Sequence, residues 1–153
     1  MSLKSTGSTI WIEITEIELS VEKVYAWSVL DNCGAVVLFS GTVRDFSDGR
    51  PGVTKLSYEA YESVAFDRMN DLANRVLTEF VGIGRVAVIH RLGEMAPGDS
   101  TVIISVSAAH REQAYEASRF LIDTLKRSVP IWKKESWQGG SDWALGANSV
   151  KDI

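Results

Sequence analysis

One stretch near the middle of the chain most constrains the fold, because its apolar residues recur at three- and four-residue steps. Between Glu62 and Val81 these residues are Ala65, Phe66, Met69, Leu72, Ala73, Val76, Leu77 and Phe80. The spacing puts them on one side of an amphipathic α-helix, which we expect to be ended by Gly82. The chain of 153 residues is 45% hydrophobic and 24% charged, which is enough apolar material for a sizeable core to cover that side.

Two further helices are predicted on either side of this one. Between Arg111 and Arg127 an apolar stripe with similar spacing predicts a second long helix. Pro130 ends it, because proline lacks the amide donor that a helix needs. Near the start of the chain, Ser20 is a typical N-cap for a short helix that reaches about Leu30.

Strands are indicated where apolar and polar residues alternate or where β-branched residues cluster. They are expected at residues 9–19, 34–44, 54–61, 85–91, 101–107 and 131–137. The run at 34–44 is expected to be a central strand, whereas 85–91 and 101–107 should pair as a hairpin around the turn at Pro97-Gly98. Asp45–Val53 is expected to be an exposed loop, and the chain beyond Gly139-Gly140 a polar tail.

The order of these elements predicts an α+β fold in one domain covering residues 1–153. The expected architecture is a mainly antiparallel, mixed sheet with two long helices and one short helix. A single cysteine, Cys33, excludes an internal disulfide and a zinc ribbon. No apolar run is long enough to span a membrane and no signal peptide is recognisable, so we expect a soluble, cytoplasmic protein.

The charge is distributed unevenly along the chain. The net charge of -4 argues against binding to nucleic acid. Residues 1–31 hold two lysines against five acidic residues, a balance of -3, whereas residues 85–134 hold eight lysines or arginines against five acidic residues, a balance of +3. A swing of this kind can arise by chance on a solvated surface. If it reflects a site, the later region is where an anion would bind.

Several common catalytic motifs are missing from the sequence. It contains no G-x-S-x-G, no G-x-x-x-x-G-K-[ST], no G-x-G-x-x-G and no H-E-x-x-H. The familiar hydrolases, NTPases and dehydrogenases therefore have no support. The two glycines Gly82 and Gly84 are interpreted as a helix end followed by a turn.

His110 and Arg111 lie at the junction between a predicted strand and the predicted helix that follows it. Unpaired amides and the helix dipole favour an anion at such a position. The pair is therefore a candidate anion site, although His110 can equally be a helix cap and Arg111 a solvated charge.

Lys126, Lys133 and Arg44 are the other candidates. Lys126 is in the last predicted turn of its helix, and Lys133 follows seven residues later, after Pro130. A helix end, a turn and a short strand can bring both ammonium groups to one pocket, although each can also be an ordinary terminal or edge charge. Arg44 ends a strand beside the exposed loop, a usual address for functional groups. If the five basic residues converge, the pocket would bind phosphate or carboxylate, and crowding would lower the pKa of a lysine.

Four blocks of sequence, in the same order, resemble the MoaE family, the large catalytic subunits of molybdopterin synthase. They are GAVVLFSGTVRD, RVAVIHRLGEMAPGD, SAAHREQAYEASRFLIDTLKRSVPIWKKE and the following W-x-x-G. The resemblance runs from about Ile10 to Ala144. It is least typical in the loop Phe46–Val53.

The resemblance implies a hammerhead-like α+β fold and an activity. The enzyme would convert cyclic pyranopterin monophosphate, also called precursor Z, to molybdopterin by installing a dithiolene. Sulfur would arrive as a thiocarboxylate on the C-terminal Gly-Gly of a small ubiquitin-like carrier of the MoaD type. No cofactor and no metal would be needed, and Cys33 would be structural.

The resemblance also assigns roles to residues and an assembly. It implies that Lys126 and Lys133 are catalytic, and that Arg44, His110 and Arg111 bind the substrate. A homodimer with one carrier at each outer end would form a heterotetramer. Two other classes stay open on the sequence: a binding module that holds an acidic tail or nucleotide without catalysis, and a dimerisation domain with no site. Five tryptophans favour a dimer that buries aromatic surface, although a core can absorb them.

Overall fold

The computed structural model describes residues 2–46, 52–137 and 140–143, which form three helices and nine strands. In chain order they are β1 (Leu3–Thr6), β2 (Ile10–Thr15), α1 (Val21–Ser28), β3 (Ala35–Thr42), β4 (Val53–Ala60), α2 (Glu62–Glu79), β5 (Ile83–Arg91), β6 (Gly93–Met95), β7 (Ser100–Ala108), α3 (Arg111–Ser128), β8 (Ile131–Trp137) and β9 (Gly140–Trp143). None of these helices is long and apolar enough to cross a membrane.

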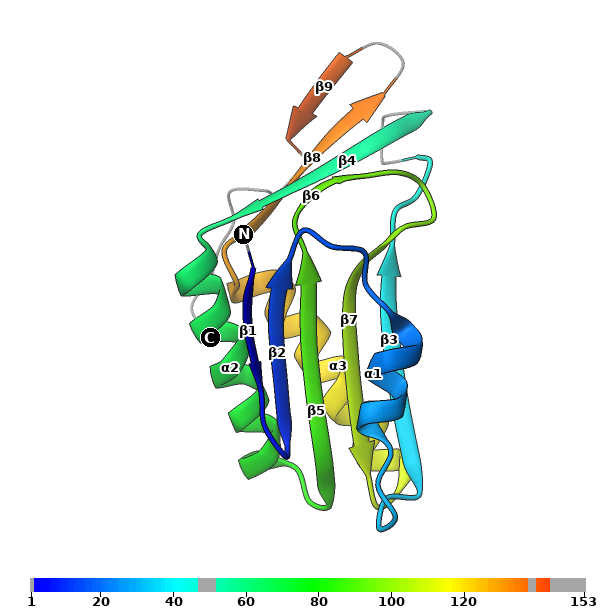
Figure 1. Ribbon diagram of the computed structural model, residues 1–153, viewed down its shortest axis with the longest axis vertical. Helices are drawn as coiled ribbons and strands as arrows, with labels where there is room; N and C mark the ends of the chain where they lie inside the picture. Colours follow the sequence, from blue (N-terminus) through cyan, green and yellow to red (C-terminus); the bar gives the residue numbers. More distant parts are fainter. Residues whose placement is uncertain (1, 47–51, 138–139, 144–153) are drawn as a thin grey trace.

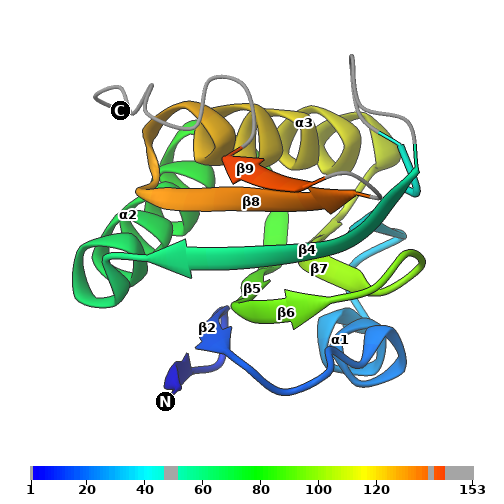
Figure 2. The ribbon, with the colours of Figure 1, turned by 90° about the horizontal axis from the view of Figure 1, so that it is seen from above.

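The larger of two sheets has five strands in the order β1-β2-β5-β7-β3. Its pairs are antiparallel except for β2 with β5, so the expected mixed, mainly antiparallel α+β fold is confirmed. Helices α2 and α3 cover one face of this sheet and α1 lies against the other (Figures 1 and 2). The predicted hairpin of β5 and β7 forms its centre.

The main core lies between the sheet and the two long helices. Fully buried side chains on the two sides include Ile14 and Ile104 of the sheet, Met69 and Leu72 of α2, and Leu121 of α3. A second, smaller cluster fills the space under α1, where Val24 packs on Ala87, Ile89 and Ile103. The apolar stripes in the sequence therefore mark the buried sides of all three helices.

The second sheet has four strands in the order β6-β4-β8-β9 and lies across one end of the first (Figures 1 and 2). Its antiparallel β4–β8 pair places Tyr58 directly opposite Lys133. Val43, Leu56 and Met95 form a small buried cluster beneath it. This sheet covers the end of the first sheet at which β3 and β5 end.

Some sequence-based expectations were wrong. The strand expected in the centre, now β3, lies at an edge of the five-stranded sheet, because β7 pairs with both β3 and β5 and leaves the other side of β3 without a partner among the described residues. Strand β1 was not predicted, and neither were β6, inside the expected turn at 93–99, and β9, inside the expected tail. These short strands carry too few residues for a period-2 pattern to stand out.

Gly82 and Gly84 have different roles in the fold. Helix α2 ends at Glu79, and Gly82 then takes a positive φ of 76°, as expected for the turn after a helix. Gly84 lies within β5 instead of in the turn, and a Cβ there would be 2.5 Å from Cys33 Sγ. Only glycine lets the loop carrying Cys33 pack so closely on β5. The expected loop 45–53 lies largely outside the described residues.

Candidate active site

Lys126, Lys133 and Arg44 come together under the second sheet. Lys126 is in the last turn of α3, Lys133 is in β8, and Arg44 follows the end of β3. Burial lowers the pKa of Lys126, and the positive charges of Lys133 and Arg44 lower it further. The three cations are therefore close enough for their charges to repel one another.

A tight connection between α3 and β8 brings the two lysines into this arrangement. The Val129 amide donates to the Leu125 carbonyl at 3.0 Å and closes the helix, and Pro130 prevents it from continuing. The Ile131 amide then donates back to the Val129 carbonyl at 2.8 Å. The chain thus reverses within three residues and enters β8 beside the helix end.

The position of Arg44 is fixed by backbone hydrogen bonds of the preceding residue, Val43. Val43 is buried, its amide donates to the Asp99 carbonyl at 3.0 Å, and its carbonyl accepts from the Gly98 amide at 2.9 Å. The Arg44 side chain itself is exposed, with its guanidinium 5.0 Å from the centre of the Phe46 ring. A rigid backbone therefore presents a solvent-accessible guanidinium to the site.

Lys126 has an unusual environment for a helix-end lysine. The residue keeps contact with solvent, yet the first cause of its lowered pKa is the protein that surrounds it. Both observations fit a side chain that is open to solvent on one side and enclosed on the others. A lysine in this environment loses its proton more easily than one on a free surface, which suits a group that transfers protons.

His90, the second-last residue of β5, also belongs to the site, although the sequence analysis did not identify it. It is 4% exposed, its Nδ1 lies 2.8 Å from the Arg91 carbonyl, and its ring meets Tyr58 edge to face at 4.9 Å. Burial lowers its pKa to about 4, with a further contribution from the charge of Lys126. His90 is therefore neutral at pH 7, and Nδ1 carries the proton because a carbonyl can only accept. A histidine at the end of an apolar strand was the available signal.

His110 and Arg111 lie at the opposite end of α3. Sixteen residues separate His110 from Lys126, which is roughly 24 Å along a helix axis. His110 is the N-cap residue but makes no capping hydrogen bond with its side chain. The two residues line a surface cavity of about 510 Å³ together with Gly34, Ala109 and Glu112. One chain therefore brings three of the five predicted residues together and leaves two apart.

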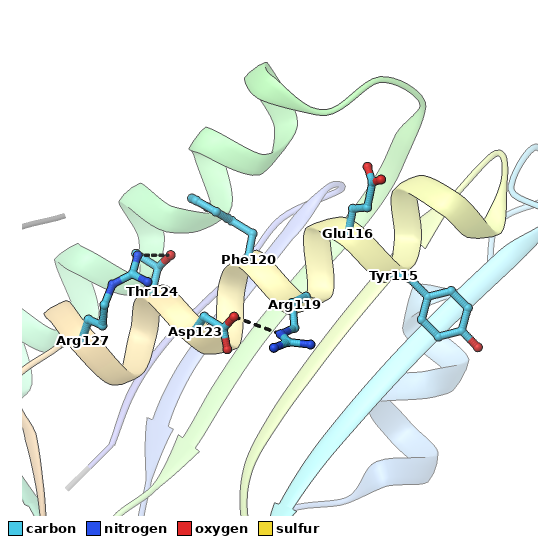
Figure 3. A pocket seen from close by; sticks show the side chains of 7 residues that line it. All are labelled: Tyr115, Glu116, Arg119, Phe120, Asp123, Thr124 and Arg127. Carbon is cyan, nitrogen blue, oxygen red and sulfur yellow. Dashed lines mark hydrogen bonds and ion pairs between the residues drawn. The ribbon is translucent and has the colours of Figure 1, made fainter.

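Another cavity, of about 570 Å³, lies on the outer side of α3 and is lined by residues of that helix between Tyr115 and Arg127 (Figure 3). Three of its charged residues make hydrogen bonds within the helix: Arg119 donates to Asp123 at 3.0 Å, and Arg127 donates to the Thr124 hydroxyl at 3.4 Å. In the described part of the chain, no group of three or more His, Cys, Asp or Glu side chains could hold a metal ion.

Comparison with known proteins gives consistent results. The model of the family described as "MoaE protein" matches residues 14–128. A protein of Nostoc sp. named molybdopterin synthase catalytic subunit is 41% identical over 136 residues, which cover 88% of this chain and 82% of that protein. The crystal structure of molybdopterin synthase from Staphylococcus aureus aligns with a TM-score of 0.80 at 34% identity, covering 86% of this chain and 94% of that one.

A more distant structure shares the fold. It comes from Helicobacter pylori and is described as a protein–protein complex of subunits 1 and 2 of molybdopterin-converting factor. It aligns with a TM-score of 0.74 at 21% identity, covering 92% of this chain and 94% of that one.

Proposed function

The chain belongs to the MoaE family, the catalytic subunits of molybdopterin synthase, and we propose that it is the sulfurtransferase that acts on cyclic pyranopterin monophosphate. It is an enzyme of molybdenum cofactor biosynthesis. The observation that carries the proposal is the meeting of Lys126, Lys133 and Arg44 at one place, where burial and then the charges of the other two cations lower the pKa of Lys126. We propose the cytoplasm as the location of this reaction.

The cationic site suits both partners of the reaction. A cyclic phosphate and a thiocarboxylate each carry negative charge, and Arg44 and Lys133 can attract either group. The sulfur comes from the carrier, so the chain needs no nucleophilic cysteine, and Cys33 packs against Gly84 on β5. In each transfer the thiocarboxylate sulfur bonds to a side-chain carbon of the pterin as that carbon gives up a C–O bond, and water then cleaves the acyl–sulfur bond and leaves a carboxylate on the carrier tail. Two transfers complete the dithiolene.

Lys126 has the properties of the acid–base group in these steps. Because burial and the neighbouring cations lower its pKa, Lys126 gives up its proton more easily than an ordinary lysine; in its neutral form it can accept a proton from the attacking water, and the resulting ammonium can donate it to the leaving group. Lys133 lies opposite Tyr58 on the neighbouring strand and is positioned to stabilise negative charge that develops on the thiocarboxylate oxygen.

A second copy of the chain supplies the two missing substrate-binding residues in this proposal. Strand β3 is an edge strand whose Ala35 end lies beside Ala108, next to His110, and whose Thr42 end leads to Arg44. If two β3 edges pair antiparallel about a two-fold axis, His110 and Arg111 of one copy approach Arg44 of the other. The exposed edge and the open His110–Arg111 cavity support this arrangement.

The remaining partner is the small carrier of the MoaD type. In this proposal its C-terminal Gly-Gly, which carries no side chains, brings the thiocarboxylate to Lys126. With one carrier on each active site, the dimer becomes a heterotetramer.

Reconstitution tests the proposal. The purified chain is mixed with thiocarboxylated carrier and cyclic pyranopterin monophosphate, and molybdopterin and spent carrier are quantified by mass spectrometry. We expect one molybdopterin for every two carriers consumed. Carrier binding without product would identify a binding module instead, and the absence of both binding and product would leave only a dimerisation domain.

A further inference from the structure

The link between α3 and β8, which bears both lysines, is held from outside by helix α2. Arg68, in the second turn of α2, donates through Nη1 to the carbonyl of Ser128, the last residue of α3. At the start of the same helix, the Tyr61 amide donates to the Pro130 carbonyl at 3.2 Å. Two hydrogen bonds from α2 thus flank Val129, midway between the helix end and β8.

Arg68 satisfies a group that the fold otherwise leaves unpaired. The last four carbonyls of a helix have no partner within it, and Ser128 is buried, so water does not readily replace the missing donor. A guanidinium both donates to that carbonyl and places positive charge at the negative end of the α3 dipole. Within the described residues, no carboxylate lies at ion-pair distance from Arg68, and its guanidinium donates instead to the Ser128 carbonyl.

The other hydrogen bonds of this helix end are local, although Leu125 and Val129 also pack in the main core. The Ser128 hydroxyl donates back to the Thr124 carbonyl at 2.6 Å, and the Val129 amide reaches only to Leu125. Neither contact ties α3 to another element. The Arg68 hydrogen bond does so, and it reaches the residue two positions after Lys126.

We propose that Arg68 is a positioning residue, which fixes the last turn of α3 so that Lys126 faces Lys133 and Arg44. This inference rests on the proposed role of Lys126. Without the Arg68 guanidinium, the last turn of α3 can fray and Lys126 can move away from Lys133 and Arg44. A displacement of about 1 Å in a positioned group can cost on the order of a hundredfold in rate.

The electrostatics of the site provide a measurement, the pH–rate profile, that would not change if Arg68 only supported the fold. The groups that face Lys126 are Lys133 from β8, Arg44 after β3 and His90 from β5, with Tyr58 of β4 beside His90. If Lys126 moves away from these cations and into solvent, its pKa rises towards the ordinary value of 10.5. The limb of the pH–rate profile that belongs to Lys126 must then move to higher pH.

The experiment compares three substitutions of Arg68 in the reconstituted synthase. Arg68→Met keeps the apolar stem and removes the donors, Arg68→Gln is a second neutral variant in case one of the two fails to fold, and Arg68→Lys restores charge and a donor. Arg75→Met is the matched control, because Arg75 is on the same helix but pairs with Glu79 at 3.3 Å and lies over the Phe120 ring. Lys126→Ala is assayed alongside, with all variants well below their melting temperatures.

We expect the neutral variants to lose about tenfold to a hundredfold in kcat, with the KM for carrier little changed and the pH limb moved upward. Arg68→Lys should recover most of the loss and Arg75→Met should behave as wild type. Wild-type kcat in the neutral variants, or a loss with an unmoved pH limb that Arg68→Lys does not repair, would overturn the role of Arg68. Wild-type turnover by Lys126→Ala would instead overturn the proposed function.

Discussion

Lys126→Ala separates catalysis from stability more sharply than any other single change. The side chain keeps contact with solvent and makes no recorded hydrogen bond within the described residues, and alanine is a good helix former. Truncation should therefore change the free energy of unfolding by no more than about 0.5 kcal/mol. The loss of a positioned acid–base group typically lowers a rate by about 10²- to 10⁴-fold, which is about 3 to 5 kcal/mol in the activation barrier.

The sign of the small stability change follows from the lowered pKa of Lys126. Between that lowered pKa and 10.5 the unfolded chain binds more protons than the folded chain, so this group adds stability as the pH rises through the window. At pH 7 the ammonium is repelled by Lys133 and Arg44. The variant should therefore melt at the same temperature as wild type or slightly higher at pH 7, and lose this relative advantage as the pH approaches 10.5.

The assay measures molybdopterin formed from cyclic pyranopterin monophosphate and thiocarboxylated carrier, together with melting temperature and carrier affinity. Arg127→Ala is the matched control, because Arg127 is in the same turn but lines the cavity on the outer side of α3 (Figure 3). Wild-type turnover by Lys126→Ala would refute the catalytic role. Lost turnover together with a collapsed melting temperature would show that the residue supports the fold instead.

Three other changes test the surroundings of Lys126. Lys133→Gln should lower turnover and raise the pKa of Lys126, because one repelling charge is gone; the upward shift of the pH–rate profile measures this, and an unmoved profile would count against it. His90→Gln should make stability depend less on pH, because the pKa of His90 is lowered from 6.5 to about 4, which costs the folded wild type about 3 kcal/mol as the pH falls through that window. Urea unfolding at several pH values measures how the free energy of unfolding changes with pH. The same change in wild type and variant would contradict a buried, neutral His90. Phe39→Glu puts a charge on the edge strand β3, where Phe39 is 37% exposed, and should give a folded monomer with impaired substrate binding; light scattering that still gives a dimer would exclude this edge as the interface.

The long elements were predictable from sequence because periodicity reports which side of an element is buried. The stripes of α2 and α3 and the alternation of β2 each carry enough residues for the period to be read, and Ser20 caps α1 as expected, with its hydroxyl accepting from the Lys23 amide at 3.2 Å. Sheet order is different, since it depends on which strands meet across long separations. The apolar β3 run therefore looked central, although β7 leaves it at the edge.

The site was predictable to the extent that neighbours in sequence are neighbours in space. Lys126 and Lys133 are joined by a short turn, so their meeting follows from the helix end and Pro130. His90 and Arg68 reach the site through tertiary packing, from β5 and α2, and no local pattern marks them. His110 and Arg111 were correctly located at a helix start, yet the length of α3 keeps them away from Lys126 within one chain.

The length of α3 has a consequence for genetics. If each active site joins the Lys126 end of one α3 to the Arg111 end of the other, a chain defective only at Lys126 and a chain defective only at Arg111 can complement each other. In the mixed dimer one site carries both lesions and the other carries neither. Random mixing makes half of the dimers mixed, so about a quarter of all sites are intact from two inactive parents. Two alleles that each fail alone would then support cofactor synthesis when expressed together.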